Sequence, residues 1–127
     1  MTASFSAFSQ TATSLEKEEH LLDGNNFTVQ YQNATAIDFS FENGEITYKW
    51  IAGRNAEEPA KTLSYTSKKV ASETYFVSWH ERDAQTYVTM VYNFAANVGS
   101  VSVIARYGSG KPFTGFQAGV IEHIGSL

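Results

Sequence analysis

Hydrophobic and polar residues alternate along most of the chain, which is the period expected of β-strands. The clearest example is the stretch 74–81, in which Tyr75, Val77 and Trp79 fall on one face and mark it as the buried side. Glu81 ends this strand on the same face as Trp79. Drawing even a neutral polar group into an apolar interior costs on the order of 2–7 kcal/mol, so a carboxylate there needs a partner or a task. Glu81 is therefore the leading candidate for a functional side chain.

The same alternation predicts seven further strands, at 26–32, 36–41, 46–50, 61–67, 85–94, 101–107 and 116–124. Asn43-Gly44 predicts a two-residue hairpin turn, because a type I′ turn needs positive φ at both central residues. We expect another turn at Lys68-Lys69 and a loop at the glycine-rich stretch 108–112. Eight short strands without a long helix between them exclude a parallel α/β fold.

The predicted fold is all-β, an eight-stranded antiparallel up-and-down barrel of the calycin or lipocalin type. Closing the sheet removes edge strands, and eight strands leave an interior that is either filled by side chains or holds one small ligand. Residues 1–12 are small and polar, and we expect a flexible segment there. Thr13-Ser-Leu-Glu16 has capping-box spacing, which predicts a short helix to about Leu22. Residues 13–127 would thus form one barrel domain.

Composition narrows the range of partners. The chain has 127 residues, a net charge of −4 and no basic stripe, so nucleic acid is not expected. It has no cysteine, and its three histidines lack metal-ligand spacing, so we expect no metal and no cofactor. The first thirteen residues carry no Lys or Arg and no apolar run, which predicts a cytoplasmic protein without a membrane partner. A homodimer is left open.

Large aromatic residues on the inward faces suggest a cavity wall with a few polar points, the usual composition of a small-molecule site. The candidates for ligand contact are Tyr48, Trp50, Tyr75, Trp79, Tyr92 and Arg54. Glu81 could act there as a general acid or base. Alternatively, it could be a carboxylate at the barrel mouth, hydrated or paired with Arg82 or Arg54.

Three motifs carry a resemblance to a known family. They are Phe27-x-Val29-x-Tyr31-x-Asn33, Ile37-Asp38-Phe39 and Tyr75-x-Val77-Ser78-Trp79-x-Glu81. With them the chain resembles the MoaF-like family of small calycin-type barrels over roughly residues 22–107, and the last of the three motifs is the most specific. It is similar, more distantly, to the phenolic acid decarboxylases, whose barrel is of the same kind.

The second resemblance implies roles for individual residues. In such decarboxylases a tyrosine pair on the first strand grips the substrate carboxylate, a glutamate after the Trp transfers a proton, and an arginine assists. Tyr31 matches the second tyrosine and Glu81 the glutamate, whereas Val29 stands where the other tyrosine would be. Arg54 is the nearest arginine, in a loop of different sequence.

We therefore expect the barrel to bind a small, largely apolar or aromatic organic molecule in its interior. The alternative is a cofactor-free lyase, isomerase or cyclase acting on such a molecule, with Glu81 moving a proton and Tyr31 steadying charge. A third reading is an interaction module whose barrel is packed solid. A cavity that contains Glu81 near Tyr31 would keep the first two hypotheses, and a filled interior would favour the third.

Overall fold

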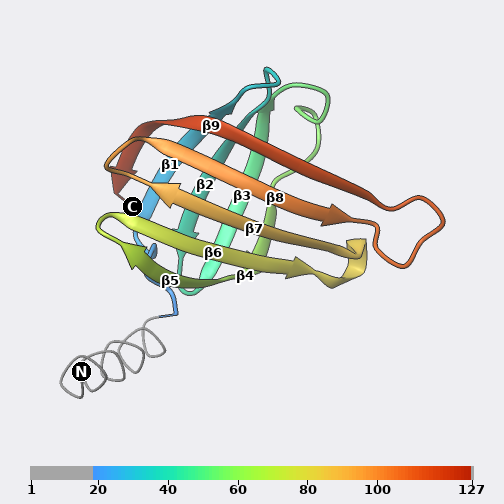
Figure 1. Ribbon diagram of the computed structural model, residues 1–127, viewed down its shortest axis with the longest axis horizontal. Coiled ribbons are helices and arrows are strands. Elements are labelled where there is room, and N and C mark those ends of the chain that lie inside the picture. The colour runs from blue at the N-terminus through green and yellow to red at the C-terminus, as the bar shows by residue number, and fades with distance from the viewer. Residues whose placement is uncertain (1–18, 127) are drawn as a thin grey trace, which may run out of the picture.

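The computed structural model describes residues 19–126 as a single antiparallel sheet of nine strands that curls into a nearly closed barrel. The strands are β1 (Asn25–Tyr31), β2 (Ala36–Glu42), β3 (Glu45–Ala52), β4 (Lys61–Ser64), β5 (Thr66–Ala71), β6 (Thr74–Glu81), β7 (Thr86–Asn93), β8 (Val98–Ala105) and β9 (Phe113–Ser126). Their spatial order is β4-β3-β2-β1-β9-β8-β7-β6-β5. Figure 1 shows β5 to β9 as one layer lying across β1 to β3. The all-β antiparallel barrel predicted from the sequence is confirmed.

The structure has nine strands where the sequence predicted eight, because the predicted strand 61–67 is divided at Tyr65. The Tyr65 side chain is 1% exposed, and its hydroxyl donates to Asp23 Oδ1 at 2.8 Å. The Tyr65 N–H donates to the carbonyl of Gly44. These contacts hold a corner at which the chain passes from one layer of the barrel to the other.

The predicted turn at Lys68-Lys69 is wrong, since both lysines lie in β5 and pair with Phe76 and Tyr75 of β6. The turn instead falls at residues 72–73, where Glu73 adopts a φ of 50°. In the sheet order β5 is an edge strand, and lysines are common on edges because they discourage pairing with other chains. By contrast, the predicted turn at Asn43-Gly44 is confirmed, with φ angles of 53° and 76°.

Most of the predicted N-terminal helix, and the whole of segment 1–12, lie outside the described residues. The part that is described, residues 19–22, consists of turns rather than helix. Within 19–126 no helix is long and apolar enough to cross a membrane.

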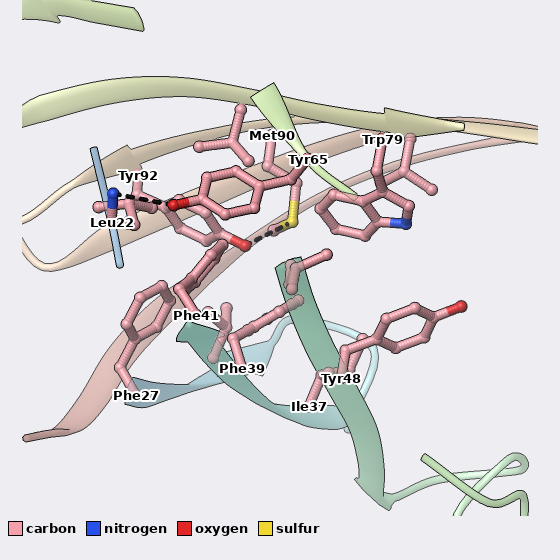
Figure 2. Packing of buried hydrophobic residues seen from close by; sticks show 14 of the residues in the cluster. Leu22, Phe27, Ile37, Phe39, Phe41, Tyr48, Tyr65, Trp79, Met90 and Tyr92 are labelled. Carbon is pink, nitrogen blue, oxygen red and sulfur yellow. Dashed lines mark hydrogen bonds between the residues drawn. The ribbon is translucent and has the colours of Figure 1, made fainter. Parts of the chain in front are cut away.

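One end of the barrel is filled with aromatic side chains. Phe27 packs edge-on against Tyr92 with ring centroids 4.8 Å apart, and Phe41 packs against Tyr65 at 4.9 Å. Leu22, 3% exposed, lies beside these rings, and its N–H donates to the Tyr65 hydroxyl (Figure 2). This end is closed, so any space inside the barrel has to lie toward the opposite end.

Candidate functional site

The opposite end of the barrel contains an open cavity of about 940 Å³. Its inner wall is largely apolar and includes Ile37, Phe39, Trp50, Val88, Met90, Val101 and Val103. Polar and charged side chains line the part near the mouth, among them Arg54, Glu58, Lys61, Glu81 and Arg106. Figure 2 shows Tyr48 and Trp79 at this end, away from the packed rings around Leu22. The barrel is thus half filled and half hollow.

Glu81 is the most heavily hydrogen-bonded group in the cavity wall. It is 6% exposed, and its Oε2 accepts from the Tyr48 hydroxyl at 2.7 Å and from Trp79 Nε1 at 3.2 Å. Its Oε1 accepts from Lys61 Nζ at 3.3 Å. The sequence pattern correctly placed Glu81 on the buried face beside Trp79. Its ionic partner is Lys61, whereas the sequence suggested Arg82 or Arg54.

These contacts cross the seam at which the sheet is not closed by backbone hydrogen bonds. β4 lies beside β6, but the two strands form no ladder, and the sheet order ends at β4 and β5. Tyr48 and Lys61 are direct neighbours on β3 and β4, and both reach across to Glu81 on β6. The Tyr48 and Trp79 rings add a contact with centroids 5.8 Å apart. Glu81 therefore joins the two sides of the barrel near its mouth.

Both cavity tyrosines have phenol groups that resist ionisation, for different reasons. Burial raises the pKa of Tyr48 well above its usual value, and the hydrogen bond to Glu81 raises it further. Burial alone raises the pKa of Tyr31. The Tyr31 hydroxyl is buried and has no hydrogen-bond partner within the described part of the chain. It is the one buried side-chain polar atom of residues 19–126 in this condition.

Comparison with known proteins connects this barrel to a family. The family model described as MoaF-like matches residues 23–116, which is most of the chain. The chain belongs to the MoaF-like family. A solved structure from Burkholderia vietnamiensis, described as a "putative beta-lactamase", is similar to this MoaF-like barrel with a TM-score of 0.68. It is 19% identical and the match covers 84% of this chain and 95% of that one, which shows a shared fold. Comparison with curated proteins gave no match.

The structure brings most of the candidate residues of this MoaF-like chain together. Six of the eight line the cavity, namely Tyr31, Tyr48, Trp50, Arg54, Trp79 and Glu81. Tyr92 and Tyr75 do not. Tyr92 is 0% exposed among the packed rings, with its hydroxyl directed at Met90 Sδ, and Tyr75 packs against Phe94. Val29, which stands in place of a decarboxylase tyrosine, is fully buried in the core. The roles of the six remain predictions.

Three charged residues of the wall, Glu58, Lys61 and Arg106, were not singled out from the sequence. Lys61 could have been found, because it begins the alternation that continues through Leu63 and Tyr65 on the inward face. Arg106 offers no such signal, since its φ of 53° breaks the strand period just after β8. Arg106 lies 5.0 Å from the Phe113 ring centroid, and both residues line the mouth.

The histidines of this family member lie away from the cavity wall. His80 faces the outside of β6 and contacts the Tyr107 hydroxyl at 2.6 Å, and His123 lies beside Glu122 on β9. Among residues 19–126 there is no group of three or more His, Cys, Asp or Glu side chains placed to hold a metal ion.

Proposed function

We propose that this MoaF-like barrel binds a small, largely apolar or aromatic organic molecule in its open cavity. The observation that carries the proposal is the volume of about 940 Å³ behind a wall of apolar side chains. Small-molecule sites typically have about 300–1,000 Å³ and such a wall. A molecule that buries roughly 250 Å² of apolar surface would gain about 6 kcal/mol before ordering costs.

The polar groups of the wall would orient the molecule. The buried Tyr31 hydroxyl has both a donor and an acceptor to offer, and no other side chain of the described residues uses them. A hydroxyl or carbonyl oxygen on the inner end of the ligand would satisfy it if binding turns the Tyr31 hydroxyl toward the cavity. Arg54 and Arg106 at the mouth would favour a ligand whose outer end is polar or anionic.

Proton transfer by Glu81 is not part of this proposal. Its two oxygens accept hydrogen bonds from Tyr48, Trp79 and Lys61, and these contacts hold the seam of the barrel together. A general acid or base needs an oxygen that can reach the substrate, and three of the roughly four acceptor positions of this carboxylate are already used. The contacts favour a positioning role for Glu81, in which it fixes the rings of Tyr48 and Trp79 at the cavity wall.

Binding can be tested with a fluorescent aromatic probe, 8-anilinonaphthalene-1-sulfonate, followed by displacement with a panel of small aromatic compounds. Val103→Trp would place a large ring in the cavity, because Val103 lines it from β8. Ile51→Trp is the matched control, since Ile51 points outward from β3 and is 48% exposed. We expect Val103→Trp to weaken probe binding at least tenfold and Ile51→Trp to leave it unchanged.

Equal probe binding by both variants, with circular dichroism showing intact folding, would refute the proposal. A second readout comes from the two tryptophans of the chain, Trp50 and Trp79, because both line the cavity. A bound aromatic compound should therefore quench the intrinsic tryptophan fluorescence. Native mass spectrometry of protein purified from its own host would identify a molecule that co-purifies with the wild type and is absent from Val103→Trp.

A further inference from the structure

The outer face of β6 to β9 has a composition unlike the rest of the barrel surface. Its outward side chains form four rows across the strands, and the pairing register gives them as Thr74-Asn93-Val98-Val120, Phe76-Val91-Ser100-Ala118, Ser78-Thr89-Ser102-Phe116 and His80-Tyr87-Ile104-Thr114. None of these residues is Asp, Glu, Lys or Arg. We call this surface the uncharged face. In Figure 1 it belongs to the layer formed by β5 to β9.

Large apolar side chains are exposed on the uncharged face. Phe116 is 83% exposed, and six others are also exposed, namely Phe76, Tyr87, Val91, Val98, Ile104 and Val120. Taking about 150–200 Å² for a fully exposed large side chain, these seven present roughly 600 Å². That is the upper end of the range of about 300–600 Å² for the largest apolar patch of a monomer. Patches of this size are often functional.

The outer face of β1 to β3 differs in charge. There the cross-strand neighbours of Thr28 are Asp38 and, beyond it, Lys49, and the turn between β2 and β3 is flanked by Glu42 and Glu45. The outer face of β1 to β3 thus carries charges within it, whereas the uncharged face has a charged neighbour at its border, where Lys68 of β5 pairs with Phe76. The protein has a net charge of −4, yet the uncharged face itself contains no charged side chain that would have to be desolvated when another surface packs against it.

We propose that the uncharged face is the interface of a homodimer, in which a second copy of this chain packs sheet against sheet. A two-fold interface places one patch against itself, so any net charge on the patch would meet the same charge on the partner copy. The uncharged face carries no such penalty. The exposed apolar area of roughly 600 Å², together with the Ser and Thr side chains that lie between the apolar residues, approaches the roughly 800 Å² that each partner buries in a standard interface. The inference is independent of what the cavity binds.

The rows also fit a two-fold arrangement in shape. In the row of Phe116, the other members are Ser78, Thr89 and Ser102, all of them small, and Phe116 stands at one end. A two-fold axis parallel to the strands, through the middle of this row, would put Phe116 of each copy over Ser78 of its partner. Each protruding ring would then lie over small side chains, and the contact would occur twice.

Sedimentation velocity over a concentration series tests the proposal. We expect the wild type to sediment at twice the chain mass of 14.0 kDa, and Phe116→Glu or Val91→Glu to weaken dimerisation at least tenfold. Ile51→Glu is the matched control, because it places the same new charge on an exposed apolar residue of β3, outside the uncharged face. It should leave the dimer intact. Circular dichroism checks that every variant is folded.

Three results would overturn the proposal. One is a wild type that remains monomeric at all concentrations. Another is a dimer that survives Phe116→Glu and Val91→Glu with unchanged affinity, which would place the interface elsewhere. The third is a monomeric wild type that floats with phosphatidylcholine–phosphatidylglycerol vesicles while Phe116→Glu does not, since the occupant of the face would then be a lipid surface.

Discussion

Tyr31 and Tyr48 both line the cavity, and replacing each with phenylalanine should change stability in opposite directions. The Tyr48 hydroxyl donates to Glu81 Oε2 at 2.7 Å, in a buried position that bridges β3 and β6. A hydrogen bond to a charged group contributes about 1.5–3 kcal/mol. Because Trp79 Nε1 still donates to the same oxygen in Tyr48→Phe, we expect a loss of about 2 kcal/mol.

The Tyr31 hydroxyl is buried without a partner among the described residues, so the folded state gains nothing from it. In the unfolded chain the same hydroxyl is hydrated, and leaving it unpaired after burial costs about 1–3 kcal/mol. Tyr31→Phe removes that cost and keeps the ring. We expect it to raise the free energy of unfolding by about 1 kcal/mol, the lower bound of this range.

Urea unfolding followed by far-ultraviolet circular dichroism measures both effects in one experiment. The opposite shifts of the two variants amount to about 3 kcal/mol, which exceeds the error of extrapolation to zero denaturant. In thermal unfolding, a loss of about 2 kcal/mol corresponds to a fall of roughly 8 °C for a domain of this size. Tyr87→Phe is the matched control, because its exposed hydroxyl makes only a 3.4 Å contact with Ser78 and should contribute little.

The reasoning fails if Tyr31→Phe destabilises the protein as much as Tyr48→Phe does. Such a result would mean that the Tyr31 hydroxyl has a hydrogen-bond partner in the folded protein. A Tyr48→Phe variant as stable as the wild type would show instead that the bond to Glu81 contributes nothing across the seam.

Three further outcomes are expected. Lys61→Met should lower the free energy of unfolding by less than about 1 kcal/mol, because the Lys61 side chain is 46% exposed and its pair with Glu81 is screened; a larger loss in urea would contradict this. Phe41→Ala should cost about 3–5 kcal/mol by leaving a cavity in the filled end, and a loss below 1 kcal/mol would show that this end collapses easily. Burial raises the pKa of four tyrosines in the folded protein above the unfolded value of 10.0, namely Tyr31, Tyr48, Tyr65 and Tyr92. Because these groups ionise first in the unfolded chain, the free energy of unfolding should fall above about pH 10, by about 1.4 kcal/mol per pH unit per buried tyrosine. Phenolate absorbance during an alkaline titration should show that these four tyrosines ionise only when the protein unfolds.

Local patterns predicted which face turns inward for the strands with clear alternation. The alternation around Trp79 placed Glu81 on the buried side, and it is 6% exposed there. Asn43-Gly44 predicted its turn because few residues other than Gly and Asn accept positive φ. The turn at 72–73 escaped detection for the converse reason, since Ser72 and Glu73 carry no such preference.

The alternating pattern did not predict the height of a side chain along the barrel axis. Tyr48 and Tyr92 both sit on inward faces, yet one lines the cavity and the other is packed in the filled end. An alternating pattern reports a face only, whereas height depends on how the registers of successive strands add up around the barrel. For the same reason the sequence did not predict which cation meets Glu81.

By itself, then, the sequence determined an antiparallel all-β chain with an acid on its inner surface, because period-two alternation and turn residues are local properties. The tertiary structure alone decided that one end is filled and the other hollow. It also decided that Glu81 bonds to Tyr48, 33 residues away, and to Lys61, 20 residues away, across a seam without backbone pairing. Such contacts arise only when distant strands are brought together by closure of the sheet.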